Sequence, residues 1–194
     1  CDRLISSADY LTESLAPAQA GAFLYVGLMH AQSLIERYGL QPHPEGGWYR
    51  ELHRSRQAVV RADGQQRSAI TAILFLLEAG SVSRWHRVSR ADETWHFAGG
   101  DPLELLVLPP GEGELVRHCL GPVAAGSCQP PDCDPELLEP MAVVPAGWWQ
   151  AARSLGAWSL VSCCVGPGFD FADFTLLRDL PADQQTDRAL SAFL

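Results

Sequence analysis

Four positions combine side-chain types and a spacing that suit a small polar site. His86 and Val88 are two residues apart in a mostly apolar stretch, Glu93 follows closely, and Gln150 lies in a later segment. Residues two apart on a β-strand point to the same face. We expect Glu93 to come from the neighbouring strand and Gln150 from the other half of a barrel, so that all four side chains converge inside it.

His86 and Glu93 are the candidate catalytic residues among these four. A pocket histidine has an ordinary pKa near neutrality and can act as a general base. The alternative is a hydrogen-bonded pocket histidine with no chemical role. Glu93 would orient His86 or act as an acid or base itself, or it would be a buried structural carboxylate paired with an arginine.

Other side chains would complete the pocket as ligand contacts. Tyr49 and Glu51 share one strand face, and Tyr49 becomes a candidate proton donor if that face looks inward; core packing is the alternative. Trp95 and Trp148 share the inward face with Glu93 and Gln150, where aromatic walls would suit a sugar face or a planar base. Core filling is the alternative for the tryptophans.

The charged candidates are arginines, of which Arg84 and Arg153 belong to a group that could make a local positive pocket. Arg153 would contact a carboxylate or phosphate of the ligand, or would form an ion pair with Asp170 or Asp173. His43 and His53 are weaker candidates, because both fall where turns or edges are expected.

The elements that must position these residues are mostly short strands. From Trp48 onward apolar residues recur with a period of two, and Gly- and Pro-rich turns separate the stretches. The expected strands are Trp48–Arg54, Ser68–Leu77, Ser81–Trp85, Glu93–Ala98, Leu103–Leu108, Leu115–Leu120, Met141–Val144, Trp149–Arg153 and Trp158–Val165. The pattern predicts an all-β sandwich, barrel or jelly roll. A helix is expected before these strands, ending at Gly39.

Composition limits the partners. The chain of 194 residues carries a net charge of −9 without a basic block, which argues against nucleic-acid binding. No apolar stretch approaches the roughly 20 residues of a membrane span, and the acidic N-terminal flank is unlike a secretory signal. We therefore expect a cytoplasmic protein with reduced thiols. Cys128 and Cys133, in a Pro-rich loop, could alternatively form a bridge.

The spacing of the four positions resembles the two motifs of the cupin superfamily. The first reads Gly80, His86, Val88, Glu93 and Gly100, and the second reads Pro145, Gly147 and Gln150. The strings PHPEGG, WHR, PAGWWQAAR and PGFDFADF are similar to an uncharacterised branch of that superfamily, over residues 34–178. The resemblance implies a double-stranded β-helix, the cupin jelly-roll barrel. With the helical patterns at the two ends of the chain, we expect a helical extension at 1–33, the cupin domain at 34–180 and a short helix at 181–194.

The departures from the cupin pattern concern the metal. Metal-dependent cupins hold a divalent ion with three histidines and one glutamate, and here Val88 and Gln150 replace two of those histidines. Losing two imidazoles removes most of the affinity for transition metals. We expect no tightly bound cofactor; a divalent metal held by His86, Glu93 and Gln150 is the weaker alternative.

Three functions remain open. The first is a metal-independent isomerase, epimerase or lyase acting on a small polar molecule derived from a sugar or a nucleotide. The second is a non-catalytic binding protein for a small molecule, and the third is a metal-dependent dioxygenase or isomerase with an unusual ligand set. We also expect a homodimer, because the edge strands of a jelly roll need covering.

Overall fold

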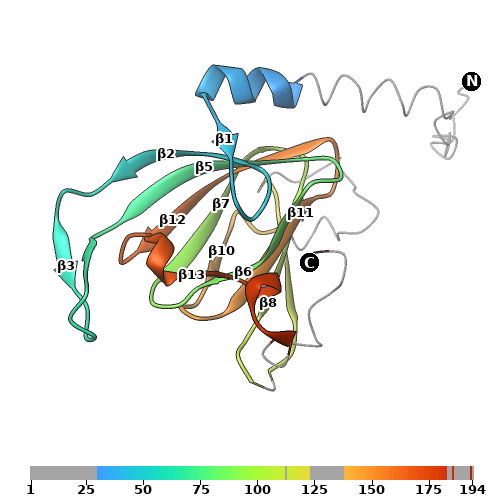
Figure 1. The fold of residues 1–194 in the computed structure, drawn as a ribbon. Helices are drawn as coiled ribbons and strands as arrows, with labels where there is room; N and C mark the ends of the chain where they lie inside the picture. Colours follow the sequence, from blue (N-terminus) through green and yellow to red (C-terminus); the bar gives the residue numbers. More distant parts are fainter. Residues whose placement is uncertain (1–29, 112, 123–137, 183–184, 186–192, 194) are drawn as a thin grey trace, which may run out of the picture.

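Two antiparallel sheets face each other across an apolar core in the computed structural model (Figure 1). The structure describes residues 30–111, 113–122, 138–182, 185 and 193. The six-stranded sheet has the order β1 (Gln41–Pro42), β2 (Trp48–Arg54), β5 (Thr71–Glu78), β12 (Trp158–Gly166), β7 (Asp92–Gly100) and β10 (Met141–Val144). The five-stranded sheet has the order β13 (Phe174–Leu176), β6 (Val82–Val88), β11 (Trp149–Ser154), β8 (Leu103–Leu108) and β9 (Val116–Leu120). This architecture confirms the all-β jelly roll.

The core lies between the two sheets and follows the two-residue alternation of the strands. Phe75 of β5, Trp95 of β7 and Val161 of β12 point inward from the larger sheet, where they meet Leu105 and Ala152 of the smaller one. One end of the barrel, where β5 and β7 begin and β6 ends, carries polar side chains instead. The inward residues there are Thr71 of β5, Glu93 of β7 and His86 of β6.

A helix over residues 30–38 covers the outer face of the larger sheet (Figure 1). Its apolar residues Ala31 and Ile35 pack against Leu76 and Leu160. Gly39 ends the helix as expected, with a φ of 60° and a hydrogen bond from the Leu40 amide to the Ile35 carbonyl at 2.9 Å. The helix continues past residue 33, where the boundary between the helical extension and the cupin domain was expected.

The predicted strands agree with the observed ones apart from their ends and four short additions. Ser68 ends β4 (Gln66–Ser68), and β5 begins only at Thr71. The additions, which the sequence pattern did not predict, are β1, β13 and the two strands of the arm, β3 (Ala58–Val60) and β4. The arm projects from the barrel at the left of Figure 1. The short helix expected at 181–194 falls largely outside the described residues.

The cysteines depart in part from the expectation of reduced thiols. Cys119 is disulfide-bonded, whereas Cys163 and Cys164 are free. Within the described ranges, no helix has the length and the apolar character needed to cross a membrane. The homodimer, the cytoplasmic location and the lack of nucleic-acid binding stay predictions.

Candidate functional site

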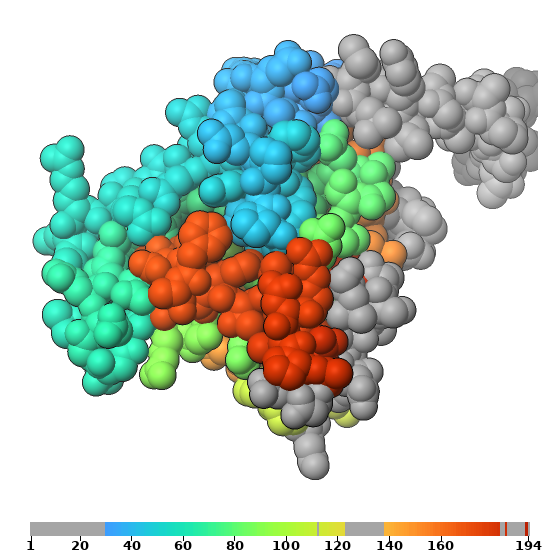
Figure 2. Space-filling view, viewed as in Figure 1, coloured from blue at the N-terminus to red at the C-terminus, as the bar shows by residue number. Residues whose placement is uncertain are grey.

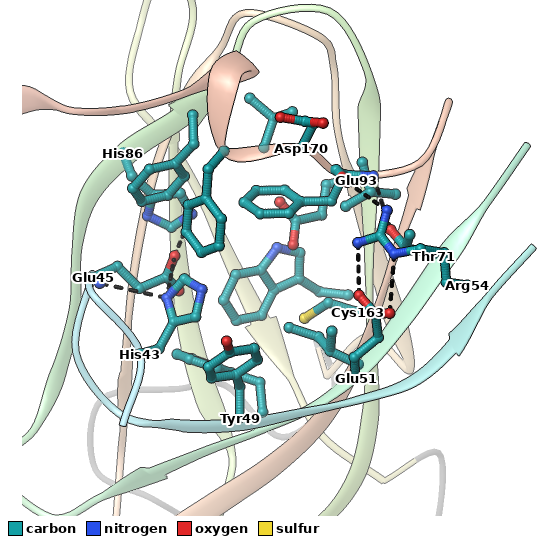
Figure 3. A pocket seen from close by; sticks show the side chains of 18 residues that line it. His43, Glu45, Tyr49, Glu51, Arg54, Thr71, His86, Glu93, Cys163 and Asp170 are labelled. Atoms are coloured by element: carbon teal, nitrogen blue, oxygen red, sulfur yellow. Dashed lines mark hydrogen bonds and ion pairs between the residues drawn. The ribbon is translucent and has the colours of Figure 1, made fainter. Parts of the chain in front are cut away.

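A cavity of about 310 Å³ opens at the polar end of the barrel (Figure 3). Its walls come from β2, β5, β6, β7 and β12, from the loop before β2 and from the segment before β13. The lining residues are His43, Glu45, Tyr49, Glu51, Arg54, Thr71, Ile73, Phe75, His86, Val88, Glu93, Trp95, Cys163, Val165, Phe169, Asp170, Phe171 and Phe174. Aromatic walls with a few converging polar groups are typical of small-molecule sites.

Glu45 occupies one wall of the cavity and is the centre of a buried polar cluster. Its Oε2 lies 3.2 Å from Nε2 of His86 and 3.3 Å from Nδ1 of His43. Ser83 donates its hydroxyl proton to Oε1 at 2.8 Å. Figure 3 shows the two imidazoles on either side of this carboxyl group. The carboxylate is therefore held by partners from two separate parts of the chain.

Two glycines bring Glu45 to this place. Gly46 has a φ of 112°, and a Cβ atom there would lie 2.1 Å from the carbonyl oxygen of Val82. Gly47 has a φ of 68°, also in the left-handed region. The loop can therefore fold tightly onto β6, where the Arg84 amide donates to the Glu45 carbonyl at 2.8 Å.

The hydrogen bonds of His86 determine how many protons this cluster holds. Nδ1 lies 2.7 Å from the carbonyl oxygen of Arg84, which can only accept, so the Nδ1 proton is present. Nε2 then faces the Glu45 carboxyl group, and an unprotonated nitrogen next to a carboxylate would place two acceptors together. His86 and Glu45 therefore share one further proton.

Burial acts against charge on both members of the pair. It opposes ionisation of Glu45, but His86, His43 and Ser83 together outweigh it and lower the pKa of the carboxyl group. Burial lowers the pKa of His86, and the charge of Glu45 offsets this only in part. The pair suits a base whose proton can move between an imidazole and a carboxylate.

Glu93 has the opposite character. Burial, reinforced by the negative charge of Glu45, raises its pKa to about 8, although Gln150 partly opposes this by a hydrogen bond. The Gln150 amide donates to Oε2 of Glu93 at 2.7 Å. The indole N–H of Trp95 donates to Oε1 of Gln150 at 2.9 Å and so fixes the orientation of the amide. At neutral pH Glu93 is a neutral acid with Oε1 left to carry the proton.

Arg54 lies on the opposite side of the cavity from the Glu45 cluster (Figure 3). Its Nε and one terminal nitrogen donate to the two oxygens of Glu51, at 3.0 and 2.7 Å. The other terminal nitrogen donates to the carbonyl of Phe169 at 3.0 Å. The guanidinium group thus ties β2 to the segment before β13.

Aromatic rings from that segment form the outer wall. Phe169, Phe171 and Phe174 contact one another with ring centroids 5.0 to 6.0 Å apart. The ring of Phe171 stacks with that of His43, with ring centroids 6.3 Å apart, and the rings of Phe174 and His86 have centroids 5.5 Å apart. Figure 2 shows this segment, in orange, on the surface beside the cyan stretch that contains β1 and the start of β2.

The structure brings six of the expected site residues into the cavity, namely Tyr49, Glu51, His86, Val88, Glu93 and Trp95. Gln150 lies behind Glu93 and acts on it through its hydrogen bond. Trp148 precedes β11 and packs against the central core. Arg84 donates to the backbone carbonyl of Glu45 at 3.2 Å.

Arg153 points away from the cavity. It lies three positions after Gln150 on the same strand, so the two side chains take opposite faces. Its Nε donates to Glu104 at 2.6 Å, and the ion pair expected with Asp170 or Asp173 is wrong. Asp173 instead accepts from Arg61 and Arg67, at 2.7 and 2.8 Å.

Glu45 was not among the expected site residues, and His43 was expected to matter less than it does. The cavity lining also includes Phe169, Phe171 and Phe174, and Cys163, which is at the same time part of the buried core. The sequence signal for Glu45 is its place in the PHPEGG string, between His43 and a Gly-Gly pair. That signal indicates a tight loop but does not show which strand the loop meets.

The described residues do not fit the cupin metal. Val88 has no donor atom, and the side-chain oxygen of Gln150 already accepts from Trp95. Within the described part of the chain, no three His, Cys, Asp or Glu side chains are grouped as metal ligands. At the cupin ligand positions, Glu93 and Gln150 are hydrogen-bonded to each other, and His86 pairs with Glu45 instead.

Comparisons with known proteins agree with this architecture. The family described as Cupin superfamily (DUF985) matches residues 32–177. A hypothetical protein from Leishmania major is 30% identical, with a TM-score of 0.68 over 84% of this chain and 96% of that one. A crystal structure from Shewanella oneidensis is 36% identical, with a TM-score of 0.63 over 75% of this chain and 83% of that one. No curated protein matches.

Proposed function

Since this chain belongs to the Cupin_5 family of the cupin superfamily (DUF985), we propose that its barrel pocket binds a small polar molecule and transfers a proton on it without a metal ion. The reaction class is isomerisation, epimerisation or elimination. All three begin by removing a proton from a carbon atom next to an electron-withdrawing group.

One observation carries the proposal: a single cavity holds two carboxyl groups whose pKa values shift in opposite directions. The pKa of Glu45 is lowered and that of Glu93 is raised to about 8. Titratable groups whose environments separate their pKa values in this way make natural acid–base pairs. Structural carboxyl groups can also show perturbed values, and an exchange experiment distinguishes the two cases.

The roles follow from the protons that each group holds. The Glu45 carboxylate takes the proton from the substrate carbon, while the proton that it shares with His86 stays on Nε2 of the imidazole. Glu93 donates its Oε1 proton to the oxygen on which negative charge develops. Returning a proton to carbon completes an isomerisation or epimerisation, whereas in an elimination the group on the neighbouring carbon leaves with its bonding electrons as the carbonyl re-forms. Tyr49 packs edge-on against His43, with ring centroids 4.6 Å apart, and we assign it to positioning that imidazole.

Deuterium incorporation from D₂O tests this proposal even while the product is unidentified. The full chain is incubated with pools of small sugars, nucleosides and keto compounds, and mass spectrometry identifies any compound that gains deuterium. We expect His86→Gln and Glu93→Gln to abolish the exchange. His118→Gln is the matched control, because His118 pairs with Glu139 at 2.7 Å and does not line the cavity. Unchanged exchange in both cavity variants would contradict the proposal.

A second candidate is a binding protein without catalysis. It is favoured by the internal pairing of the polar cluster: Glu45 is engaged by His43, Ser83 and His86, and Glu93 by Gln150. Groups paired in this way could serve only to fix the shape of the pocket. A compound that binds the natural chain but gains no deuterium would support this second function.

A further inference from the structure

Resting on the binding role proposed above, we infer that the cavity selects an uncharged molecule with a flat ring and rejects the phosphorylated or carboxylated forms of the same molecule. The inference concerns ligand class, whereas the proposed function concerns proton transfer. The inference depends on which charged side chains in and around the cavity already have partners within the protein.

Arg54 is the one guanidinium or ammonium group among the described residues that line the cavity. Its three nitrogens are all engaged, two by Glu51 and one by the Phe169 carbonyl. These bonds use three of the five N–H donors, and the Glu51 carboxylate already balances the charge of the guanidinium through two parallel hydrogen bonds. The described lining therefore offers an anionic ligand no arginine whose charge is uncompensated.

The two arginines of the β3–β4 arm, which lies next to the outer wall of the cavity, are also paired with carboxylates. Arg61 pairs with both Asp63 and Asp173, at 2.9 and 2.7 Å, and Arg67 pairs with Asp173 at 2.8 Å. A ligand whose ring enters the cavity could not place a phosphate on either group without breaking these pairs.

The buried wall is also unfavourable to an anion. The Glu45 carboxylate already has its compensating donors from His86, His43 and Ser83, and the exposed carboxylate of Asp170 lies at the mouth. A second anion beside Glu45 would lose its hydration without gaining a counter-charge, which is costly in a buried site.

The remaining surface favours a flat ring. Phe75 and Trp95 form the floor, with ring centroids 5.7 Å apart, and Phe169, Phe171 and Phe174 form the outer wall. Aromatic walls gain most from planar or ring-shaped ligands. Glu93 can supply a hydrogen bond from a neutral acid, which suits a carbonyl, hydroxyl or ring nitrogen rather than a phosphate.

Matched probe series test the inference directly. Ligand-observed NMR on the full chain would compare adenine, adenosine and adenosine monophosphate, and uracil, uridine and uridine monophosphate. We expect an uncharged member of at least one series to bind, and its phosphorylated form to bind at least tenfold more weakly. Equal or tighter binding of the phosphorylated form would overturn the inference, as would failure of every uncharged probe to bind.

A charge variant provides the converse test. Glu51→Gln removes the carboxylate that occupies Arg54, so affinity for the phosphorylated probe should rise. Asp179→Asn is the matched control, because it removes the same charge from an exposed residue outside the cavity. A rise of equal size in both variants would reflect net charge alone and would contradict the inference.

The two proposals can fail separately. A phosphorylated compound that gains deuterium, with the exchange lost in Glu93→Gln, would overturn the ligand class and leave the proposed proton transfer intact. An uncharged ligand that binds tightly without deuterium exchange would do the reverse.

Discussion

Nε2 of His86 lies 3.2 Å from Oε2 of Glu45, while Nδ1 of the same ring donates to the Arg84 carbonyl at 2.7 Å. The backbone carbonyl fixes one proton on the ring, so the second nitrogen and the carboxyl group must share another. Both side chains are at least 93% buried. A proton held between two buried groups is available for transfer to or from a ligand without a supply from bulk water.

The first prediction concerns the pKa of His86. Burial lowers this pKa and the charge of Glu45 is the largest effect that opposes the shift. Glu45→Gln removes that charge and can offer an amide N–H to Nε2, which stabilises the neutral ring. We expect the pKa of His86 to fall further, as measured by NMR titration of the imidazole signals.

The control for this titration is Glu139→Gln, which removes the carboxylate 2.7 Å from His118. That change should leave the His86 signals as they are in the natural chain. A His86 pKa that rises or stays constant in Glu45→Gln would show that the two groups do not share a proton.

The second prediction is a pH dependence of stability that originates at Glu93. Its pKa is about 8 in the folded chain and 4.5 in the reference state. Between these values the unfolded chain has released a proton that the folded chain keeps, so this residue lowers the stability as pH rises. Glu93→Gln cannot ionise and should therefore be the more stable chain at pH 8.5, by a few kcal/mol, on the order expected for such a shift.

Urea unfolding at several pH values between about 5 and 8.5 measures this difference. The stabilities of the two chains should approach each other as pH falls toward the lower value. Parallel pH curves for the natural chain and Glu93→Gln would show that the carboxyl group does not stay protonated on folding.

The third prediction concerns metal binding. Val88 and Gln150 occupy the places of two cupin histidines, so manganese, nickel or zinc should not raise the unfolding temperature of the natural chain. Val88→His combined with Gln150→His would restore imidazoles next to His86 and Glu93, and should introduce metal-dependent stabilisation. Stabilisation of the natural chain by one equivalent of metal, reversed by a chelator, would contradict this prediction.

The strands were predictable because each carries its own local signal. The stretch around Trp95 alternates apolar and polar residues, and those around Phe75 and Val161 are short, mostly apolar runs. All three end at Gly or Pro turns, which is sufficient to locate a strand. The two- and three-residue strands β1, β3 and β13 are too short to show a period. Their pairing depends on the partner strands and cannot be recognised from their own residues.

The site was predictable only where the alternation could be followed along one strand. His86, Val88 and Glu93 fall on the inward face by that rule, and the same rule applied from Gln150 would have placed Arg153 outside. Glu45 could not be found in this way, because its contact with Ser83 spans 38 residues of sequence. Its position depends on the close approach of Gly46 to β6, which is a tertiary contact.

The last prediction concerns the aromatic rim. Asp173 accepts hydrogen bonds from Arg61 and Arg67, and so fastens the segment that carries Phe171 and Phe174 to the β3–β4 arm. Asp173→Asn removes the charge and turns an amide group toward two guanidinium groups. We expect a loss of about 1–3 kcal/mol in unfolding free energy. Backbone amides at 168–174 should also exchange hydrogen faster.

The stability loss and the faster exchange should occur together if Asp173 fastens the rim. Asp179→Asn is the control. Asp179 is exposed, and its ion pair with the neighbouring Arg178 is long, with 3.6 Å between Oδ1 and Nε, so this variant should change neither measurement. Loss of stability without faster exchange at 168–174 would place the role of Asp173 in the arm alone. Faster exchange confined to residues 168–174 would instead show that the β3–β4 arm holds the outer wall of the cavity. Among the described residues, the other charged side chain bonded to the part of this wall that carries Phe169, Phe171 and Phe174 is Arg54, which donates to the Phe169 carbonyl.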